Sequence, residues 1–302
     1  MSYKSIQRKR QINLLDELFN DTGGGIFNGK SYDFILKNRI KNLWLNIRED
    51  AIVYFEKHNI DWHKDINDEP REGPEGHLLS SNISCINHLF YLRQNKELVS
   101  LILRNIDNRI VNAELIDDGY IEFEIMEGKN KNPLKEKSKE RKRGSKSTSI
   151  DAFMVGKKKD GKNVLVLLEW KYTETYENQE CKYISKDNYH KNYTDLLIEK
   201  DCPIKTHDNF MGLFFDPFYQ LMRQTLLGWK MANLNEYGSD EYIHLHIIPN
   251  GNVELKNQCS HWKLLIKDKQ KYKIISPEEL FEPILYEQDI KTLTDYLKKR
   301  YW

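Results

Sequence analysis

The sequence predicts a mixed α/β fold, in which a β-sheet is flanked by helices and an N-terminal helical layer packs on it. Three observations predict this fold. Residues 149–168 have the pattern of two apolar strands joined by a polar turn. Helical patterns precede them at 76–94 and follow them at 216–233, and a further strand-like run covers 241–248. Residues 1–75 show helical patterns around a glycine-rich turn.

The composition fits a chain with a sizeable hydrophobic core and a polar surface. The 302 residues are 39% hydrophobic, 12% aromatic and 31% charged, and the mean hydropathy is −0.73. This length allows one large domain or two small ones. Because the formal net charge is only +1, nucleic acid would have to be bound by a local basic patch.

Cysteine usage and the absence of targeting signals predict a cytoplasmic protein without membrane contact. No apolar run approaches the roughly 18 residues that a membrane span needs, and the basic N-terminus has no apolar stretch behind it. The four cysteines, Cys85, Cys181, Cys202 and Cys259, lie far apart, and none forms a C-x-x-C pair. This spacing argues against a zinc ribbon and favours reduced thiols.

The first 75 residues are predicted to form a helical region packed on the rest of the chain. Apolar residues recur at helical spacing over 5–19 and again over 32–58. The polar stretch 59–76 carries two prolines, so we predict a loop or boundary there.

A glycine-rich turn between these two helical patterns matches the P-loop pattern G-x-x-x-x-G-K-S from Gly24 to Ser31. A P-loop follows a buried strand and opens a helix. Here the preceding run is helical and acidic, and no apolar strand ending in Asp follows as a partner. We therefore predict a surface turn that uses glycine for positive φ.

The strand pair at 149–168 is the centre of the predicted sheet. Asp160-Gly161 is a strong hairpin signal between two strand-like runs. The run 164–168 is continuously apolar and fits a strand that is buried on both faces.

Three charged residues are predicted to meet at the end of this hairpin. Residues two apart on a strand share a face, so Glu169 and Lys171 project the same way. Pairing of the two strands brings Asp151 to the same end. Carboxylate oxygens suit Mg²⁺, and a lysine beside a metal site can position or deprotonate a water. The alternative is a salt bridge at the strand end with no catalytic function.

Asp151, the hairpin and Glu169-x-Lys171 resemble the PD-(D/E)XK nuclease superfamily, which includes many restriction endonucleases. Ile150 stands where the usual Pro precedes the Asp. The superfamily core runs helix, three strands, helix, strand, and the elements expected between 76 and 248 follow this order, with a strand at 120–126. The resemblance implies a restriction-endonuclease-like core with a central mixed β-sheet.

Two further segments are similar to members of this superfamily. The run from Gly76 to Ser81, continued by Cys85 and Asn87, resembles a group of predicted type II restriction endonucleases. His77 lies on the predicted first helix, which lines the metal site in this fold, so the resemblance makes it a candidate for contact there.

The predicted helix 216–233 has a clear start, with Asp216 as N-cap and Pro217 at the first helical position. It carries three polar residues, Gln220, Arg223 and Gln224. Similar Gln-bearing helices follow the E-x-K strand in several groups of the superfamily, which implies that these residues support the site or touch the DNA backbone. The alternative is the ordinary polar face of an amphipathic helix.

The resemblance implies a Mg²⁺-dependent, type II-like restriction endonuclease that hydrolyses phosphodiester bonds of double-stranded DNA, with Mn²⁺ able to substitute. Asp151 and Glu169 would hold the metal, with the Trp170 carbonyl as a further oxygen ligand. Lys171 would orient or deprotonate the attacking water and stabilise charge on the phosphate.

Other functions remain open on the sequence. One is a DNA repair or mobile-element nuclease with the same site, and another is a non-catalytic DNA-binding protein on a nuclease-like fold. The intact Asp/Glu/Lys set argues against the second. A palindromic target would imply a homodimer, and a restriction role would imply a cognate DNA methyltransferase encoded nearby.

The stretch 129–149 is rich in Lys and Arg and leads into the strand that carries Asp151. We predict that it contacts DNA phosphates, and the candidates are Lys139, Arg141, Lys142, Arg143 and Lys146. The alternative is a solvated charged loop.

Residues 76–302 are expected to form the nuclease-like domain, with an insertion at 173–210 and a C-terminal helical extension. The insertion is polar and Tyr-rich, and either reaches DNA or packs its own rings. Ser276 opens a capping box with Glu279, and a terminal helix is predicted at 291–299. His244 and His246 share a strand face without a third ligand, so we predict a structural role.

Overall fold

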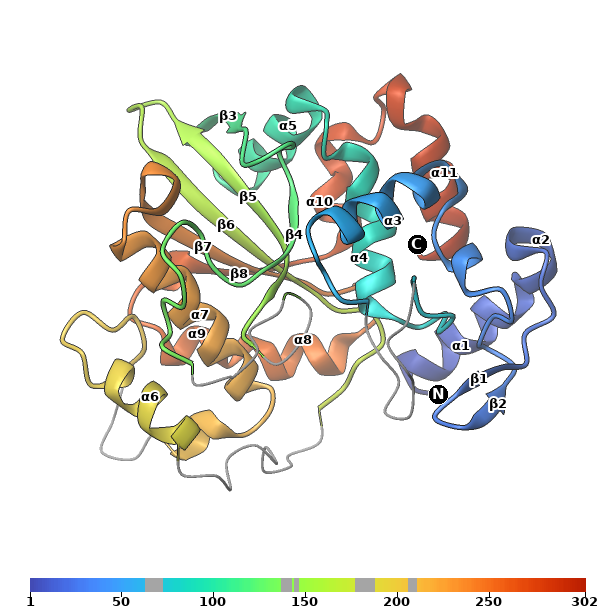
Figure 1. The fold of residues 1–302 in the computed structure, drawn as a ribbon, viewed down its shortest axis with the longest axis horizontal. Helices are drawn as coiled ribbons and strands as arrows, with labels where there is room; N and C mark the ends of the chain where they lie inside the picture. The colour runs from blue at the N-terminus through green and yellow to red at the C-terminus, as the bar shows by residue number, and fades with distance from the viewer. Residues whose placement is uncertain (63–72, 137–142, 144–146, 177–187, 206–210) are drawn as a thin grey trace.

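The computed structural model of the chain contains a central mixed β-sheet of six strands (Figure 1). The structure describes residues 1–62, 73–136, 143, 147–176, 188–205 and 211–302. The strands are β3 Ile110–Glu114, β4 Glu122–Ile125, β5 Ile150–Lys158, β6 Asn163–Trp170, β7 Ser239–Ile247 and β8 Tyr272–Ile275. Their order is β3-β5-β6-β7-β8, and β4 also pairs with β5. β5 pairs antiparallel with β3, β4 and β6. β7 pairs parallel with β6 and with β8.

The central hairpin β5–β6 confirms the predicted strand pair and turn. Ala152 pairs with Leu168 and Gly156 with Val164. The turn contains Gly161 at φ +83°, a conformation that glycine adopts without steric cost. The hairpin is therefore fixed by local sequence, and the rest of the sheet is added on either side of it.

Helices cover both faces of the sheet (Figure 1). One face carries α3 Arg48–Lys57, α4 Ser81–Leu89, α5 Lys96–Ile106, α10 Pro277–Phe281 and α11 Lys291–Arg300, and the other carries α6 Asn188–Leu197, α7 Phe218–Asn233, α8 Val253–Ser260 and α9 Trp262–Leu265. Short 3-10 helices lie at Arg39–Asn42, Leu45–Ile47, Phe90–Leu92, Met211–Phe214, Glu236–Gly238, Lys269–Lys271, Glu282–Ile284 and Gln288–Ile290. The predicted mixed α/β fold, with a central sheet between helices, is confirmed.

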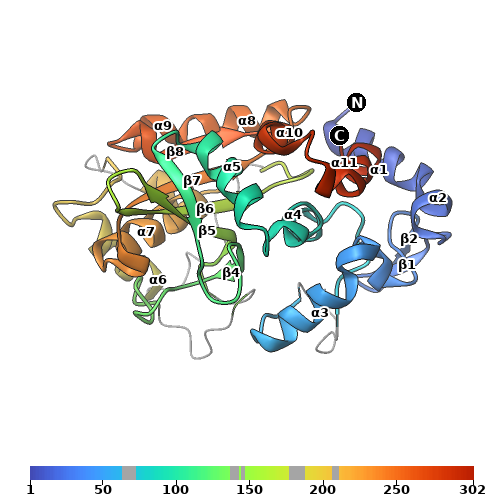
Figure 2. The ribbon, with the colours of Figure 1, turned by 90° about the horizontal axis from the view of Figure 1, so that it is seen from above.

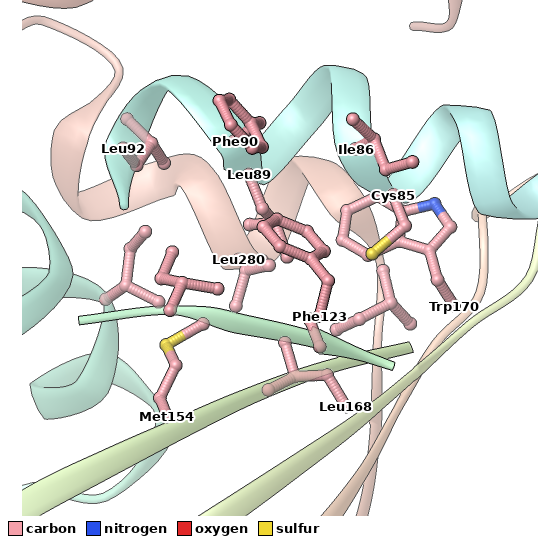
Figure 3. Close-up of a cluster of buried hydrophobic side chains, with 14 of the residues drawn as sticks. Cys85, Ile86, Leu89, Phe90, Leu92, Phe123, Met154, Leu168, Trp170 and Leu280 are labelled. Atoms are coloured by element: carbon pink, nitrogen blue, oxygen red, sulfur yellow. The ribbon is translucent and has the colours of Figure 1, made fainter. Parts of the chain in front are cut away.

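Alternation along β5 and β6 separates two hydrophobic clusters. Met154, Leu168 and Trp170 pack toward α4, whereas Phe153 and Leu167 pack toward α7. Figure 3 shows the first cluster, where Leu89 of α4 meets Phe123 of β4 above Leu168 of β6. Because side chains alternate between faces, each strand residue has one defined environment.

The N-terminal part consists of α1 Tyr3–Asn13, α2 Leu15–Phe19, and a small hairpin of β1 Gly25–Phe27 and β2 Lys30–Tyr32. Figure 2 shows these elements beside α11, close to both chain termini. The run from Gly24 to Ser31 is thus a strand hairpin with no helix opening after it, as the rejection of a P-loop predicted. No described helix combines the length and apolar character needed to cross a membrane.

Several predicted helix boundaries were wrong. The pattern 5–19 is broken at Leu14 into α1 and α2, and 32–58 is α-helical only in α3. The pattern 76–94 becomes helical at Ser81, after the N-cap Ser80. Pro217 is the N-cap of α7 and not its first residue.

Buried asparagines explain why the chain before α3 does not continue as a helix. The Asn42 side chain donates to the carbonyls of Glu75 and His77 at 2.8 and 3.0 Å. The Asn87 side chain accepts from the Trp44 amide at 2.8 Å and donates to the Asn42 carbonyl at 3.0 Å. The Asn87 side chain therefore satisfies the Trp44 amide and the Asn42 carbonyl, two backbone groups that a continuous helix would have paired internally.

The sequence analysis missed α6, α8, α9, β3 and β8, which are short or lie in polar stretches. It also missed α5, although this helix of 11 residues has a clear apolar face and the N-cap Asn95. The capping box of α10 is confirmed, since Ser276 accepts from the Glu279 amide at 3.1 Å and the Glu279 carboxylate accepts from the Ser276 amide at 2.5 Å. The terminal helix is also confirmed as α11.

Arg300 joins the N-terminal and C-terminal elements from inside the protein. Its side chain is 0% exposed. Nη1 donates to the Asn42 carbonyl at 2.7 Å and to the Tyr296 hydroxyl at 2.6 Å, and the guanidinium lies 4.8 Å from the centroids of Phe19 and Tyr301. Within the described part of the chain, no carboxylate forms an ion pair with it.

Arg300→Ala is expected to lower the free energy of unfolding by about 3 kcal/mol or more, because it leaves a cavity and buried acceptors without donors. Chemical denaturation measures the change. Lys298→Ala, at an exposed position of the same helix, should leave stability nearly unchanged. Equal stability of the two variants would contradict the assignment of Arg300 as the link between the chain ends.

Candidate active site

The structure brings Asp151, Glu169 and Lys171 together at the end of the central hairpin, on the α7 side of the sheet. Asp151 lies one position beyond the pair of Ala152 and Leu168, which places it opposite Glu169. Its Oδ2 accepts from the Trp170 amide at 2.7 Å. The predicted convergence of two carboxylates and an ammonium therefore has a structural basis in strand register.

Glu169 and Lys171 form a buried ion pair. Lys171 Nζ lies 2.7 Å from Glu169 Oε1, and the two residues are only 6% and 3% exposed, respectively. Burial pushes the pKa of Lys171 down, but attraction from Glu169 and nearby acidic groups outweighs it and raises that pKa well above the ordinary value. Lys171 is thus held as an ammonium at one position.

Two glutamines of α7 hold the Glu169 carboxylate from the helix side. Gln220 Nε2 donates to Glu169 Oε1 at 2.7 Å, and Gln224 Nε2 donates to Glu169 Oε2. Gln220 Oε1 in turn accepts from Lys171 Nζ at 2.8 Å. One turn of helix separates the two glutamines, so the spacing seen in the sequence aims both amides at one carboxylate.

Tyr176 completes this network, and the sequence had given no sign of it. Its hydroxyl donates to Gln220 Oε1 at 2.8 Å, and its ring centroid lies 5.6 Å from Lys171 Nζ. Gln258 of α8 donates to the Tyr176 carbonyl at 2.8 Å. Two donors on Gln220 Oε1 fix the amide so that its nitrogen faces Glu169.

Glu124 is a third carboxylate that the sequence reasoning missed. It accepts from Asn82 Nδ2 and from the Ser149 hydroxyl, each at 2.9 Å. Burial, and then repulsion from Glu169, raise its pKa to about 7 against the lowering effect of Ser149. Its backbone has φ +53°, which takes it out of the regular strand alternation with Glu122. The only signal in the sequence was the pair of acidic residues, Glu122 and Glu124, within a strand whose other residues are apolar.

Three carboxylates and one ammonium meet at this edge of the sheet, so negative charge is in excess there. Burial is the main cause that raises the pKa of Asp151 well above its ordinary value, and Glu169 and Glu124 add to it. Carboxylates that repel one another in a buried place are stabilised by a cation.

Glu124, Asp151, Glu169, Lys171 and Gln220 line a cavity of about 390 Å³. Its walls include Glu75, His77, Ser81, Asn82 and Phe27 in addition to the charged residues above. His77 does reach this cavity, but it lies in the loop before α4 and not on the helix. Its ring packs edge-on against Phe27 and Phe34, with centroids 5.0 and 5.2 Å away.

The remaining predicted site residues are placed differently. Arg223 lies with its guanidinium over the Tyr219 ring, 4.8 Å from the centroid. Arg143 donates to the carbonyls of Phe123 and Glu124 and pairs with Glu122 at 3.3 Å, so it faces the protein. Lys139, Arg141, Lys142 and Lys146 lie outside the described residues.

The histidine pair on β7 is buried against the protein core. His244 Nδ1 lies 3.0 Å from the Thr225 hydroxyl, and burial lowers the pKa of His244 to about 3. Among the described residues, only His58, Asp117 and Asp118 have three ligand atoms within 4.8 Å of one another. Asp118 of that group already pairs with Lys57 and Arg93.

Comparison with known proteins agrees with a nuclease. The family described as restriction endonuclease associating with ARP matches residues 10–302. No curated protein and no solved structure matches the chain. Because the match spans the whole sheet, the site and the N-terminal part, the chain belongs to this family of restriction endonucleases.

Proposed function

We propose that the protein is a metal-dependent endonuclease of the PD-(D/E)XK type, which cleaves double-stranded DNA as a type II-like restriction enzyme. The observation that carries the proposal is the meeting of Asp151, Glu169 and Lys171 at one buried strand end, in a chain of a restriction endonuclease family. A cognate DNA methyltransferase, a palindromic target bound by a homodimer and action in the cytoplasm are parts of the same proposal.

The donor set fits a hard divalent cation such as Mg²⁺ or Mn²⁺. Asp151 and Glu169 would hold the ion, together with the Trp170 carbonyl, and Glu124 is a further carboxylate in the same cavity. Mg²⁺ is commonly bound by one or two carboxylates and keeps several waters. A Mg²⁺ site therefore does not need three side-chain ligands close to one another. When bound, the ion would polarise the phosphate and lower the pKa of a water.

Lys171 is positioned to act on the attacking water and on the phosphate. Glu169 Oε1 and Gln220 Oε1 hold its Nζ at 2.7 and 2.8 Å. A fixed ammonium in a buried site orients a nucleophile and stabilises negative charge that develops in the transition state. Gln220 and Gln224 keep Glu169 in place, and Tyr176 keeps Gln220 in place.

The purified protein is expected to cut duplex DNA with Mg²⁺ or Mn²⁺ and to stop in EDTA. Ca²⁺ should permit DNA binding without cleavage, because its looser coordination does not reproduce the geometry of Mg²⁺. Gel analysis of cleavage and anisotropy of binding measure the two effects. Cutting that persists in EDTA would contradict the proposed site.

Glu169→Gln, Asp151→Asn and Lys171→Met are each expected to lower the cleavage rate by about 100-fold or more, since each removes a group of one catalytic unit. Their effects should not add when combined. Single-turnover kinetics measures the rates.

Lys158→Met is the matched control for Lys171. Lys158 is 5% exposed and pairs with Glu241 at 2.7 Å, toward the turn of the same hairpin. Both lysine variants should lose stability, but only Lys171→Met should lose cleavage. Equal cleavage by the two variants would show that the Glu169–Lys171 pair is a structural salt bridge without a catalytic role.

Glu124→Gln is expected to stabilise the metal-free protein at alkaline pH. The pKa of Glu124 is raised from 4.5 to about 7, so the folded protein favours the protonated carboxyl group. The contribution of Glu124 to stability is therefore full below about pH 4.5 and is lost as pH rises through about 7. The variant avoids this loss, on the order of 1–3 kcal/mol. Its Tm advantage in EDTA should therefore be larger at about pH 8 than at about pH 5.

Glu287→Gln, at an exposed position, should show no such difference between the two pH values. A Tm advantage of Glu124→Gln that is the same at both would contradict the charge repulsion assigned to this site.

A further inference from the structure

The cavity that holds the catalytic groups has a second wall, and the N-terminal part supplies it. Phe27 of the hairpin β1–β2 and His77 line the same cavity as Asp151, Glu169 and Lys171. The glycine-rich run that matched a P-loop thus contributes Phe27 to the cavity wall. A ligand that fills the cavity as far as Lys171 also contacts these two rings.

Four partly exposed rings form a stripe that begins at this wall, which we call the aromatic stripe: Phe27, His77, Phe34 and Tyr32. Successive ring centroids are 5.0, 5.2 and 5.3 Å apart. The guanidinium of Arg8 lies over the Phe34 ring, 4.3 Å from its centroid. Arg8 Nη2 also pairs with Asp33 Oδ1 at 2.8 Å. Because both side chains are exposed and such surface pairs are weak, a phosphate can replace Asp33, and the stripe combines ring surface with a planar cation.

Backbone hydrogen bonds between the hairpin and the neighbouring segments hold the aromatic stripe in place. Gly25 N donates to the Ile35 carbonyl at 2.9 Å, and Leu36 N donates to the Gly76 carbonyl at 2.9 Å. Ile35 also forms a β-bridge with His77. A side chain at Gly25 would place its Cβ 2.4 Å from the Leu36 carbonyl oxygen. Glycine is therefore needed here for close packing of the hairpin and not for binding a nucleotide phosphate.

The outer surface of the hairpin remains available for contact. Ile26 is 61% exposed, Lys30 is exposed, and a Cβ at Gly29 would meet no atom within 4 Å. The interior of the cavity is acidic, with Glu75, Glu124 and the catalytic carboxylates. A polyanion that enters it needs favourable contacts from outside, and the stripe with Arg8 and Lys30 provides them.

We propose that the aromatic stripe binds the DNA strand next to the scissile phosphate, with one unpaired base, outside the duplex stack, placed on Phe27 and backbone phosphates near Arg8 and Lys30. This inference rests on the proposed nuclease function and names the substrate contact made by the N-terminal part. Stacking of an unpaired base on an aromatic ring stabilises binding by about 1–3 kcal/mol and tolerates any base. A base inside the duplex would first have to leave its stack, which costs a few kcal/mol. Arginine pairs with phosphate through a planar fork. The stripe would thus add affinity without reading sequence.

The test measures DNA binding apart from cleavage. Phe27→Ala and Phe27→Leu are made in the Glu169→Gln protein, and their affinity is measured by anisotropy with Ca²⁺. The probe is a fluorescein-labelled mixed-sequence duplex that carries a few unpaired nucleotides in one strand. Phe27→Ala should weaken binding on the order of tenfold. Phe27→Leu should weaken it nearly as much, because leucine restores volume but not a ring face. Tyr286→Ala, at a ring that is 96% exposed, is the control and should bind like its parent.

A second arm keeps the test decisive if Phe27→Ala folds poorly. Arg8→Gln in the same background should reduce the slope of log K against log salt by about 0.9, as expected for one lost phosphate contact on duplex DNA. Binding by Phe27→Leu within about twofold of the parent would overturn the stacking contact. An unchanged slope for Arg8→Gln would overturn the phosphate contact.

The outcomes also separate this inference from the proposed function. If the wild-type protein cuts DNA while Phe27→Leu and Arg8→Gln bind unchanged, the stripe is rejected and the nuclease assignment stands. If the Glu169→Gln parent binds no DNA and the wild type does not cut, both are rejected.

Discussion

The buried pair of Glu169 and Lys171 is the interaction on which the site depends. Two opposite charges that are almost fully removed from water are tolerable only when further polar groups satisfy them. Gln220 and Gln224 on α7 do this for the carboxylate, and Tyr176 does it for Gln220. The position of α7 on its face of the sheet is therefore tied to the chemistry at the strand end, and α8 is tied to it through Gln258 and Tyr176.

Side chains on the two faces of the hairpin have different roles: one face is hydrophobic and packs in the core, and the other carries the charged groups of the candidate site. Leu168 and Trp170 face the cluster under α4, where they are completely buried, whereas Glu169 faces α7 between them in sequence. The Trp170 indole also donates to the Ser84 hydroxyl of α4 at 3.1 Å. A strand that is held firmly on one face can present mutually repelling carboxylates on the other, because the hydrophobic cluster fixes its register.

The N-terminal part is bound to the rest of the chain by polar groups that are buried as deeply as the core. Gln11, Asn42, Asn87 and Arg300 link α1, the 3-10 segments, α4 and α11 through side-chain to backbone hydrogen bonds. Such buried networks rigidify a structure when every member is satisfied. Asn42 also donates to the His77 carbonyl at 3.0 Å, so the network reaches a residue that lines the cavity.

The sequence by itself determined the central hairpin, the meeting of Asp151, Glu169 and Lys171, the glutamine pair and the capping box, because each depends on spacing within one or two adjacent elements. Local spacing also favoured a helix over 32–58. The buried Asn87 side chain of α4 instead pairs with the Trp44 amide and the Asn42 carbonyl, and this pairing exists only in the tertiary structure. Glu124, Tyr176 and Phe27 come from β4, from the polar stretch after β6 and from the glycine-rich hairpin, and no periodicity connects them with Glu169. Their place in the site follows from how the elements pack, which a pattern read along one chain does not encode.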